Sequence, residues 1–187
     1  MRLILASASP RRAELLSAAG FEFDVMPADV DERPRATESA ETYTLRVARD
    51  KARRVAAIGD HGATVLGADT EVVADGRILG KPATSEDAAR MLRLLSGRAH
   101  DVLTAVVVCA GGRERSEVVT TRVEFAPMSE DDVDRYVATG EPMGKAGAYG
   151  IQGYAARFID RIDGSWSNVV GLPIHTVNRL LRQLQAG

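Results

Sequence analysis

Apolar positions in the first third of the chain follow two different periods. A continuous apolar run over residues 2–7 predicts a buried strand, and alternation over 21–28 predicts a second one. Between them, residues 10–19 have helical spacing and end at Gly20. A polar loop over 29–41 leads into a long amphipathic helix over 40–58, so strands and helices alternate from the start.

In the rest of the chain, the pattern predicts β-hairpins in addition to alternating strands and helices. Two strands over 64–82 meet at Asp75-Gly76, a strong hairpin signal. Ser85 and Ser129 are the expected N-caps of two helices. In chain order, the later elements are a helix over 85–97, strands over 100–110 and 115–125, a helix over 127–140, a glycine-rich stretch over 144–153, a strand over 156–164 and a helix over 172–185. The order predicts an α/β fold with a mixed central sheet and flanking helices.

Composition narrows the class of protein. The 187 residues are 45% apolar and 27% charged, which is typical of a soluble globular protein. A net charge of −2 gives no basic field for nucleic acid, so any anion site must be a local group of cations. No window reaches the ~18–20 apolar residues that span a bilayer, and no signal peptide is evident. Cys109 is the only cysteine, which fits a reducing compartment; we expect a cytoplasmic protein with no membrane partner.

The stretch ASASPRR (6–12) places two cations where a helix repels them. Ser9 is the expected N-cap and Pro10 the first helical residue, so Arg11 and Arg12 fall in the first turn. A cation there costs roughly 0.3–1 kcal/mol at an exposed site. A bound phosphate would remove this cost, and Ser7 could join such a site. Alternatively, the arginines extend into solvent or pair with acids such as Glu14.

Two lysines differ in their setting. Lys51 lies inside a charged helix, where a solvated face is the ordinary explanation for its arginine neighbours. Lys81 lies in GKP at the end of a strand, where the chain is stiff and presents the ammonium from a fixed point. A lysine so placed suits a phosphate or a developing negative charge.

Carboxylates form the other half of the candidate chemistry. Asp69 ends an apolar strand in LGADT, where burial is costly unless the carboxylate binds something; a turn-forming Asx cap is the alternative. Glu71 lies two residues further on, so both can share a strand face. Asp31 and Glu32 follow the second strand. One or two carboxylates with substrate phosphates are the usual way to hold Mg²⁺.

Other common motifs are missing from the sequence. The histidines, at 61, 100 and 175, are scattered and form no zinc pattern, and no P-loop or GxGxxG fingerprint occurs. The glycines of GKAGAYGIQG are expected to make tight turns. Gln152 within this stretch carries an amide that can read the polar edge of a base, and Thr70 can do similar work less selectively. Trp166 is expected to pack in the core.

Together these blocks resemble the Maf family of nucleoside triphosphate pyrophosphatases. The resemblance covers nearly the whole chain and rests on blocks in a fixed order: LASASPRR (5–12), VDE (30–32), ARDKA (48–52), GADT (67–70), DGRILGKP (75–82), MLRLLSGRAHDVLTAV (91–106), TGEPMGKAGAYGIQG (139–153) and GSWSNVVGLP (164–173). It implies a single domain over 1–187 with two lobes around a nucleotide cleft. It also implies hydrolysis of a nucleoside triphosphate to the monophosphate and pyrophosphate, and a homodimer in some relatives.

The resemblance also assigns roles to residues. Asp69 matches the general base, and Glu32 and Asp69 match the acids that hold a divalent cation, Mg²⁺ or Mn²⁺. The residues that match the phosphate-handling set are Ser7, Arg11, Arg12, Lys51 and Lys81. The positions linked to substrate choice are Arg11, Thr70 and Gln152. Glu71 stands where some relatives are expected to have an apolar residue, which leaves two metal-ligand sets open.

The block AGAYGIQG resembles the branch of the family that prefers dTTP and UTP. One alternative is the branch that acts on 7-methyl-GTP. A second alternative, of a different class, is a non-catalytic nucleotide-binding regulator of septum formation. The charged set of Glu32, Lys51, Asp69 and Lys81 favours an enzyme.

Overall fold

A computed structural model of the chain describes residues 2–59 and 62–186. His61 lies outside these ranges. The strands are β1 (Leu3–Leu5), β2 (Asp24–Val25), β3 (Thr64–Ala74), β4 (Arg77–Ile78), β5 (Ala99–Ala110), β6 (Arg113–Phe125) and β7 (Ile159–Asp163). The helices are α1 (Pro10–Ala18), α2 (Ala40–Ile58), α3 (Ser85–Leu95), α4 (Glu130–Ala138), α5 (Trp166–Val170) and α6 (Ile174–Ala186), with short 3-10 turns η1 (Ala146–Ala148) and η2 (Tyr154–Arg157).

The chain divides into two compact units. The first contains Met1–Thr70, Thr104–Val119 and Gly171–Gly187, and the second contains Glu71–Leu103 and Thr120–Val170. The chain therefore passes between units along β3, β5 and β6 and once more between Val170 and Gly171. The strand order in the sheet is β2-β1-β3-β5-β6-β7, and β4 pairs with β3.

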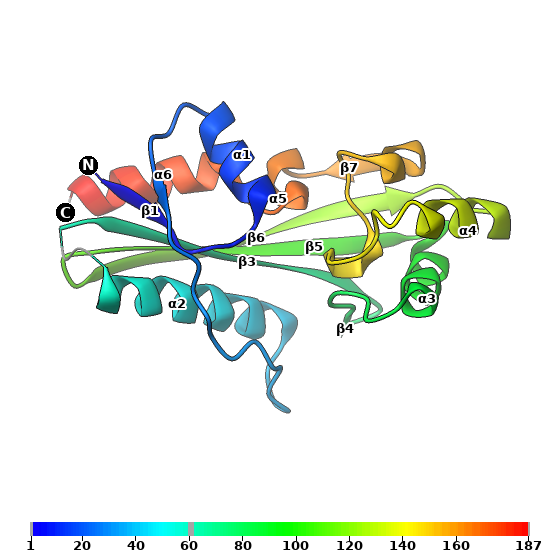
Figure 1. Cartoon of the computed structure of the whole chain (residues 1–187), viewed down its shortest axis with the longest axis horizontal. Coiled ribbons are helices and arrows are strands. Elements are labelled where there is room, and N and C mark those ends of the chain that lie inside the picture. Colours follow the sequence, from blue (N-terminus) through cyan, green and yellow to red (C-terminus); the bar gives the residue numbers. More distant parts are fainter. Residues whose placement is uncertain (1, 60–61, 187) are drawn as a thin grey trace. The chain divides into compact units, whose positions relative to one another are not determined.

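Parallel strands with helices on both faces build the first unit. Strand β1 pairs in parallel with β2 and with β3. Helix α2 covers one face of these strands, and α1 and α6 cover the other (Figure 1). Apolar side chains of the strands and of α2 form one cluster between them, in which Ile4 on β1, Val55 on α2 and Val65 on β3 are almost fully buried.

Antiparallel pairing and a separate core characterise the second unit. Strand β4 pairs with β3, and β7 pairs with β6, both antiparallel. Leu92 and Leu95 of α3 pack with Tyr136 of α4 and Phe125 of β6. Parallel and antiparallel pairs thus occur in one sheet, which confirms the predicted α/β fold with a mixed sheet.

Several predicted boundaries need correction. The strand expected over 21–28 is only Asp24–Val25, an exposed edge pair. The N-cap of α3 is Thr84 rather than Ser85, because the Thr84 hydroxyl accepts the N–H of Asp87 at 3.2 Å and Ser85 is already helical. Trp166 is 47% exposed and opens the short helix α5, so its predicted place in the core is wrong.

Over the described ranges, no helix combines the length and the apolar character that crossing a membrane requires.

Candidate active site

Lys51 lies between two carboxylates in the first unit. Its Nζ is 2.8 Å from Oδ1 of Asp69 and 2.7 Å from Oε1 of Glu32. The side chains of Lys51 and Asp69 are about nine-tenths buried, whereas that of Glu32 is half exposed. The solvated-face explanation, which holds for exposed Arg53 and Arg54, therefore does not apply to Lys51.

Gly67 allows this contact by letting α2 approach β3 closely. A Cβ atom at position 67 would lie 2.4 Å from the carbonyl oxygen of Ala48 and 2.8 Å from Cβ of Ala52. These two residues flank Lys51 on the helix, so the approach brings Lys51 onto the middle of β3. Asp69 was expected to end a strand, but β3 continues past it to Ala74. Gly67 is thus a residue of the site beyond those predicted above, and its signal in the sequence is an isolated glycine inside a strand pattern, which indicates a close backbone approach.

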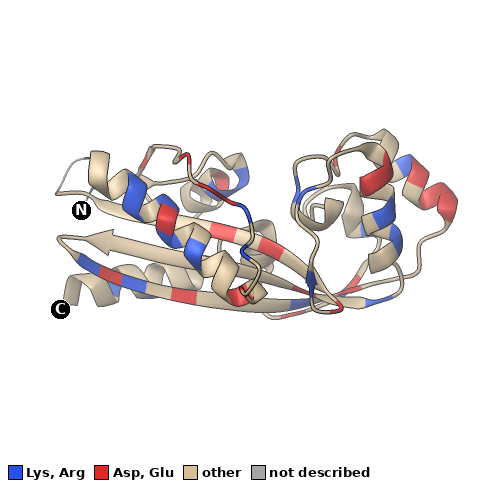
Figure 2. Cartoon of the chain, turned by 90° about the horizontal axis from the view of Figure 1, so that it is seen from below, with Lys and Arg blue, Asp and Glu red and all other residues tan. Residues whose placement is uncertain are grey.

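Helix α2 also holds the loop that carries Glu32. The hydroxyl of Tyr43 donates to the carbonyl oxygen of Glu32 at 2.7 Å. The Arg46 guanidinium donates to the carbonyl oxygens of Asp31 at 3.2 Å and Arg33 at 3.0 Å. Figure 2 shows acidic and basic residues along this helix. Two of its side chains, Tyr43 and Arg46, thus bind the backbone of the loop that carries Glu32.

The second carboxylate oxygen of Asp69 is a candidate metal ligand. Oδ2 is buried and has no hydrogen-bond partner among the residues that the structure describes. A buried carboxylate oxygen without a donor is costly, and a divalent cation is a suitable partner for it. No group of three or more His, Cys, Asp or Glu side chains arranged to hold a metal occurs in the described ranges. The residues present therefore fit a cation held by few protein ligands and by substrate phosphates.

Arg12 is buried and bound to neutral protein acceptors. Its Nε donates to the carbonyl oxygen of Gly171 at 2.8 Å, and its Nη1 donates to Ser7 Oγ at 3.0 Å and to the carbonyl oxygen of Ala68 at 2.9 Å. Its Nη2 donates to Thr70 Oγ1 at 3.0 Å. Arg12 thus ties α1 to the middle of β3 and to the segment before α6.

The hydroxyl groups of Ser7 and Thr70 belong to the same hydrogen-bond network as Arg12. Ser7 Oγ also accepts the N–H of Ser9 at 3.2 Å. Thr70 Oγ1 lies 3.0 Å from Thr104 Oγ1 and 3.3 Å from the carbonyl oxygen of Gly171. Direct contact of Ser7, Thr70 or Arg12 with a substrate stays a prediction; the structure gives each of them partners within the protein.

The two arginines at the start of α1 have different surroundings. Ser9 and Pro10 begin the helix as predicted, but the Ser9 side chain makes no capping hydrogen bond. Arg11 is half-buried, and no hydrogen bond or ion pair to another described residue satisfies its guanidinium. Of the two cations, Arg11 therefore remains available for an anion, while Arg12 is engaged by backbone and hydroxyl oxygens.

Lys81 and Gln152 belong to the second unit. Both side chains are exposed, and neither makes a hydrogen bond or ion pair within the described part of the chain. The carbonyl oxygen of Gly80, next to Lys81, accepts the N–H of Gly147 at 2.8 Å, which joins the two loops. Glu71 is buried at the start of this unit, and its part in metal binding stays a prediction.

The glycine-rich stretch makes the tight turns expected of it. Gly144 and Gly147 have positive φ, and a Cβ at Gly147 would lie 2.8 Å from Val72. Backbone conformation and close packing therefore explain why glycine occupies these two positions, and no ligand is needed to explain them.

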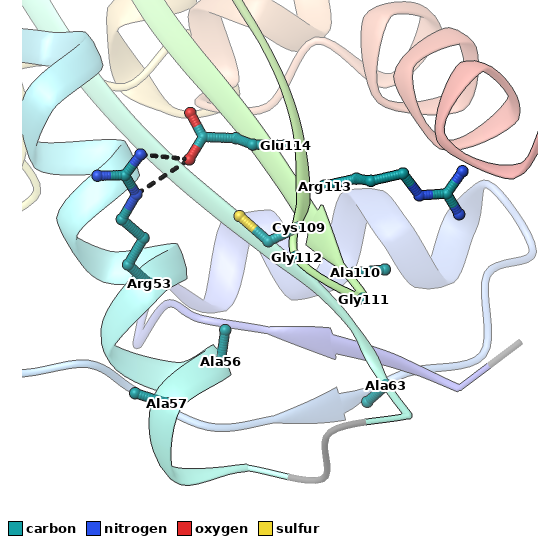
Figure 3. Close-up of a pocket in the computed structure, with 10 residues that line it drawn as sticks. All are labelled: Arg53, Ala56, Ala57, Ala63, Cys109, Ala110, Gly111, Gly112, Arg113 and Glu114. Atoms are coloured by element: carbon teal, nitrogen blue, oxygen red, sulfur yellow. Dashed lines mark hydrogen bonds and ion pairs between the residues drawn. The ribbon is translucent and has the colours of Figure 1, made fainter. Parts of the chain in front are cut away.

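A pocket in the first unit lies away from the Lys51–Asp69 pair. Arg53, Ala63, Cys109 and Glu114 are among its lining residues (Figure 3). Ala63 directly precedes β3, and Asp69 lies further along that strand, which rises by about 3.3 Å per residue. Burial, helped by Glu114, raises the pKa of the Cys109 thiol to about 11, so the thiol stays protonated and is a poor nucleophile.

Two histidines have no place in this site. His100 is buried in the second unit beside Tyr149, and His175 is exposed on α6.

Comparison with known proteins identifies the family of this chain. The chain matches the Maf family, described as "Maf-like protein", over residues 2–184. A protein of Koribacter versatilis named "dTTP/UTP pyrophosphatase" is 53% identical over 98% of this chain and 94% of its own length. Proteins of the same name from Vibrio parahaemolyticus and Anaeromyxobacter dehalogenans are 46% and 53% identical, over 98% and 97% of this chain and 97% and 93% of their own lengths. The chain therefore belongs to the Maf family.

Proposed function

We propose that this protein hydrolyses nucleoside triphosphates, dTTP and UTP in particular, to the monophosphate and pyrophosphate. The names of the relatives give the substrates. The observation that carries the proposal is the buried contact of Lys51 with Asp69, in which one carboxylate oxygen is bound by the lysine and the other has no donor in the described part of the chain.

The charges available to a triphosphate support this reaction. A nucleoside triphosphate carries about four negative charges, which repel a nucleophile unless cations neutralise them. Arg11 and Lys81 carry cationic groups with no partner among the described residues. The positive charge of Lys51 is already balanced by the carboxylates of Glu32 and Asp69.

Asp69 and Glu32 would hold a divalent cation, Mg²⁺ or Mn²⁺. When bound, such a cation neutralises phosphate charge and stabilises the pyrophosphate that leaves. Glu71 is a third candidate ligand. Lys51 contributes by keeping the Asp69 carboxylate at one fixed orientation.

Asp69 has two tasks in the proposed reaction. It orients a water molecule and accepts a proton from it as the water oxygen bonds to the α-phosphorus. The bond between the α-phosphorus and its bridging oxygen to the β-phosphorus then breaks, and pyrophosphate leaves with that oxygen. In ¹⁸O-labelled water, the label should appear in the monophosphate; label in pyrophosphate would show attack at the β-phosphorus.

The decisive experiment is a pyrophosphate-release assay with UTP, dTTP, CTP, GTP and 7-methyl-GTP, each with Mg²⁺ or Mn²⁺. We expect UTP and dTTP to react fastest, and a chelator to abolish release. Asp69→Asn should lower kcat at least about 100-fold. Asp101→Asn, at an exposed carboxylate paired with Arg122, is the matched control and should retain activity.

Two other outcomes of this assay have definite meanings. Release by the wild type no greater than that of Asp69→Asn would favour the non-catalytic regulator of septum formation. A preference for 7-methyl-GTP would place the chain in the other branch of the family. A cytoplasmic location, a homodimer and the absence of nucleic-acid partners stay predictions from the sequence.

A further inference from the structure

Gln152 lies in a tight turn of the second unit. The turn spans residues 150–153, and the N–H of Gly153 closes it by donating to the carbonyl oxygen of Gly150 at 3.1 Å. Ile151 and Gln152 are its two central residues. Because the Gln152 amide is exposed and makes no hydrogen bond within the described ranges, the backbone of the turn sets where the amide can reach.

Both ends of this turn are bound to two side chains from one neighbouring segment. The N–H of Gly150 donates to the hydroxyl of Tyr136 at 3.2 Å. The N–H of Tyr154 donates to Oε2 of Glu141 at 2.8 Å. The Tyr136 hydroxyl in turn donates to Oε1 of Glu141 at 2.9 Å. One chain of hydrogen bonds therefore links the two ends of the turn through Tyr136 and Glu141.

Burial and sterics fix this arrangement. Tyr136 is fully buried, and burial raises the pKa of its hydroxyl, which stays protonated and able to donate to the carboxylate. Its ring stacks on that of Tyr154, with centroids 5.3 Å apart and planes 12° from parallel. A Cβ atom at Gly153 would lie 2.4 Å from Oε1 of Glu141, so the carboxylate occupies the space that a larger residue would need.

We propose that Tyr136 and Glu141 are positioning residues for substrate choice: they hold the 150–153 turn so that Gln152 meets the base at one defined place. This inference rests on the proposed function and on the prediction that Gln152 reads the base. A site that hydrogen-bonds its substrate discriminates only when its polar groups are held in place.

Two variants weaken the arrangement without removing a large side chain. In Glu141→Gln, one of the two acceptor oxygens becomes a donor, so the Tyr136 hydroxyl and the Tyr154 N–H can no longer both donate to it. In Gly153→Ala, the new methyl group displaces the carboxylate, which lies at the end of a flexible side chain. Glu130→Gln is the matched control, because Glu130 lies at the start of α4 in an exposed ion pair with Arg93.

The test measures kcat/KM for UTP and for CTP, whose bases differ in donors and acceptors along one edge. We expect the ratio of the two values to fall about tenfold in Glu141→Gln and in Gly153→Ala, and to stay within about twofold in Glu130→Gln. The fall should come mainly from KM for UTP. In a Gln152→Ala background, Glu141→Gln should change the ratio no further, because its effect acts through Gln152.

Specific results would overturn the inference. A purely structural role would lower kcat/KM for UTP and CTP by the same factor and leave the ratio unchanged. The inference would also be wrong if the wild type did not distinguish UTP from CTP. It would be wrong as well if Gln152→Ala kept the wild-type ratio of kcat/KM. A wild type that releases no pyrophosphate from any nucleotide would instead overturn the proposed function, and the inference with it.

Discussion

Nζ of Lys51 on helix α2 lies 2.8 Å from Oδ1 of Asp69 on strand β3, and this contact is buried. Lys51→Met should leave Asp69 as a buried carboxylate without its cation and lower the free energy of unfolding by about 3 kcal/mol. Urea denaturation measures this change. Arg54→Met, on the exposed face of the same helix, is the control and should change stability by less than about 0.5 kcal/mol. Equal effects of the two substitutions would contradict a buried pair.

The close approach at Gly67 should not tolerate a methyl group. In Gly67→Ala the new Cβ would lie 2.4 Å from the carbonyl oxygen of Ala48, so the backbone of α2 must move. We expect a loss of about 1–3 kcal/mol in the free energy of unfolding, and a lower kcat as Lys51 moves away from Asp69. Gly20→Ala, with open space around it, should cost about 1 kcal/mol and leave kcat unchanged.

Adjacent arginines should respond differently to the same substitution. Arg12→Lys leaves several buried oxygens without their donors, since an ammonium cannot reproduce the guanidinium geometry, and should destabilise the protein by about 2–4 kcal/mol. Arg11→Lys should change the urea midpoint little and raise KM for the nucleotide. Similar unfolding midpoints for the two variants would show that the Arg12 contacts contribute little.

Serines at two helix starts should also differ. Ser129 and Asp132 form a full capping box at α4, in which the Ser129 hydroxyl accepts the N–H of Asp132 at 3.2 Å. Ser129→Ala should therefore lower the free energy of unfolding by about 1 kcal/mol. Ser9 makes no capping hydrogen bond at α1, so Ser9→Ala should cost less than about 0.5 kcal/mol. Thermal or urea unfolding of both variants tests the difference.

Buried His100 should make stability depend on pH. Burial lowers its pKa from 6.5 to about 4, so the unfolded chain binds a proton at this position at higher pH than the folded protein does. Stability should therefore fall as the pH falls from 6.5 toward 4, by about 2–3 kcal/mol at pH 4.5.

Urea midpoints at pH 7.0 and pH 4.5 measure this loss. His100→Gln should reduce the difference between the two pH values, whereas His175→Gln, at an exposed histidine, should retain the wild-type difference. An unchanged pH dependence in His100→Gln would assign the effect to other groups.

Periodicity predicted most helices and the central strands, because these elements bury a regular apolar face. It was less accurate where tertiary contacts decide the boundary. The alternating segment around Asp24 forms only two paired residues because it lies at the exposed sheet edge. The N-cap of α3 is Thr84 rather than the predicted Ser85, because either hydroxyl could cap the helix and only that of Thr84 accepts the N–H three residues on.

The sequence by itself determined the family, the mixed α/β fold and the candidate residues, because each of these depends on local residue type and on the order of blocks along the chain. Tertiary structure decided what each candidate contacts. The close approach of α2 to β3 at Gly67 brings Lys51 into contact with Asp69. Of the two neighbouring arginines, Arg12 donates to backbone oxygens, whereas Arg11 is available for an anion. Local pattern could not decide this, because the partners of Arg12 lie as far as 159 residues away along the chain.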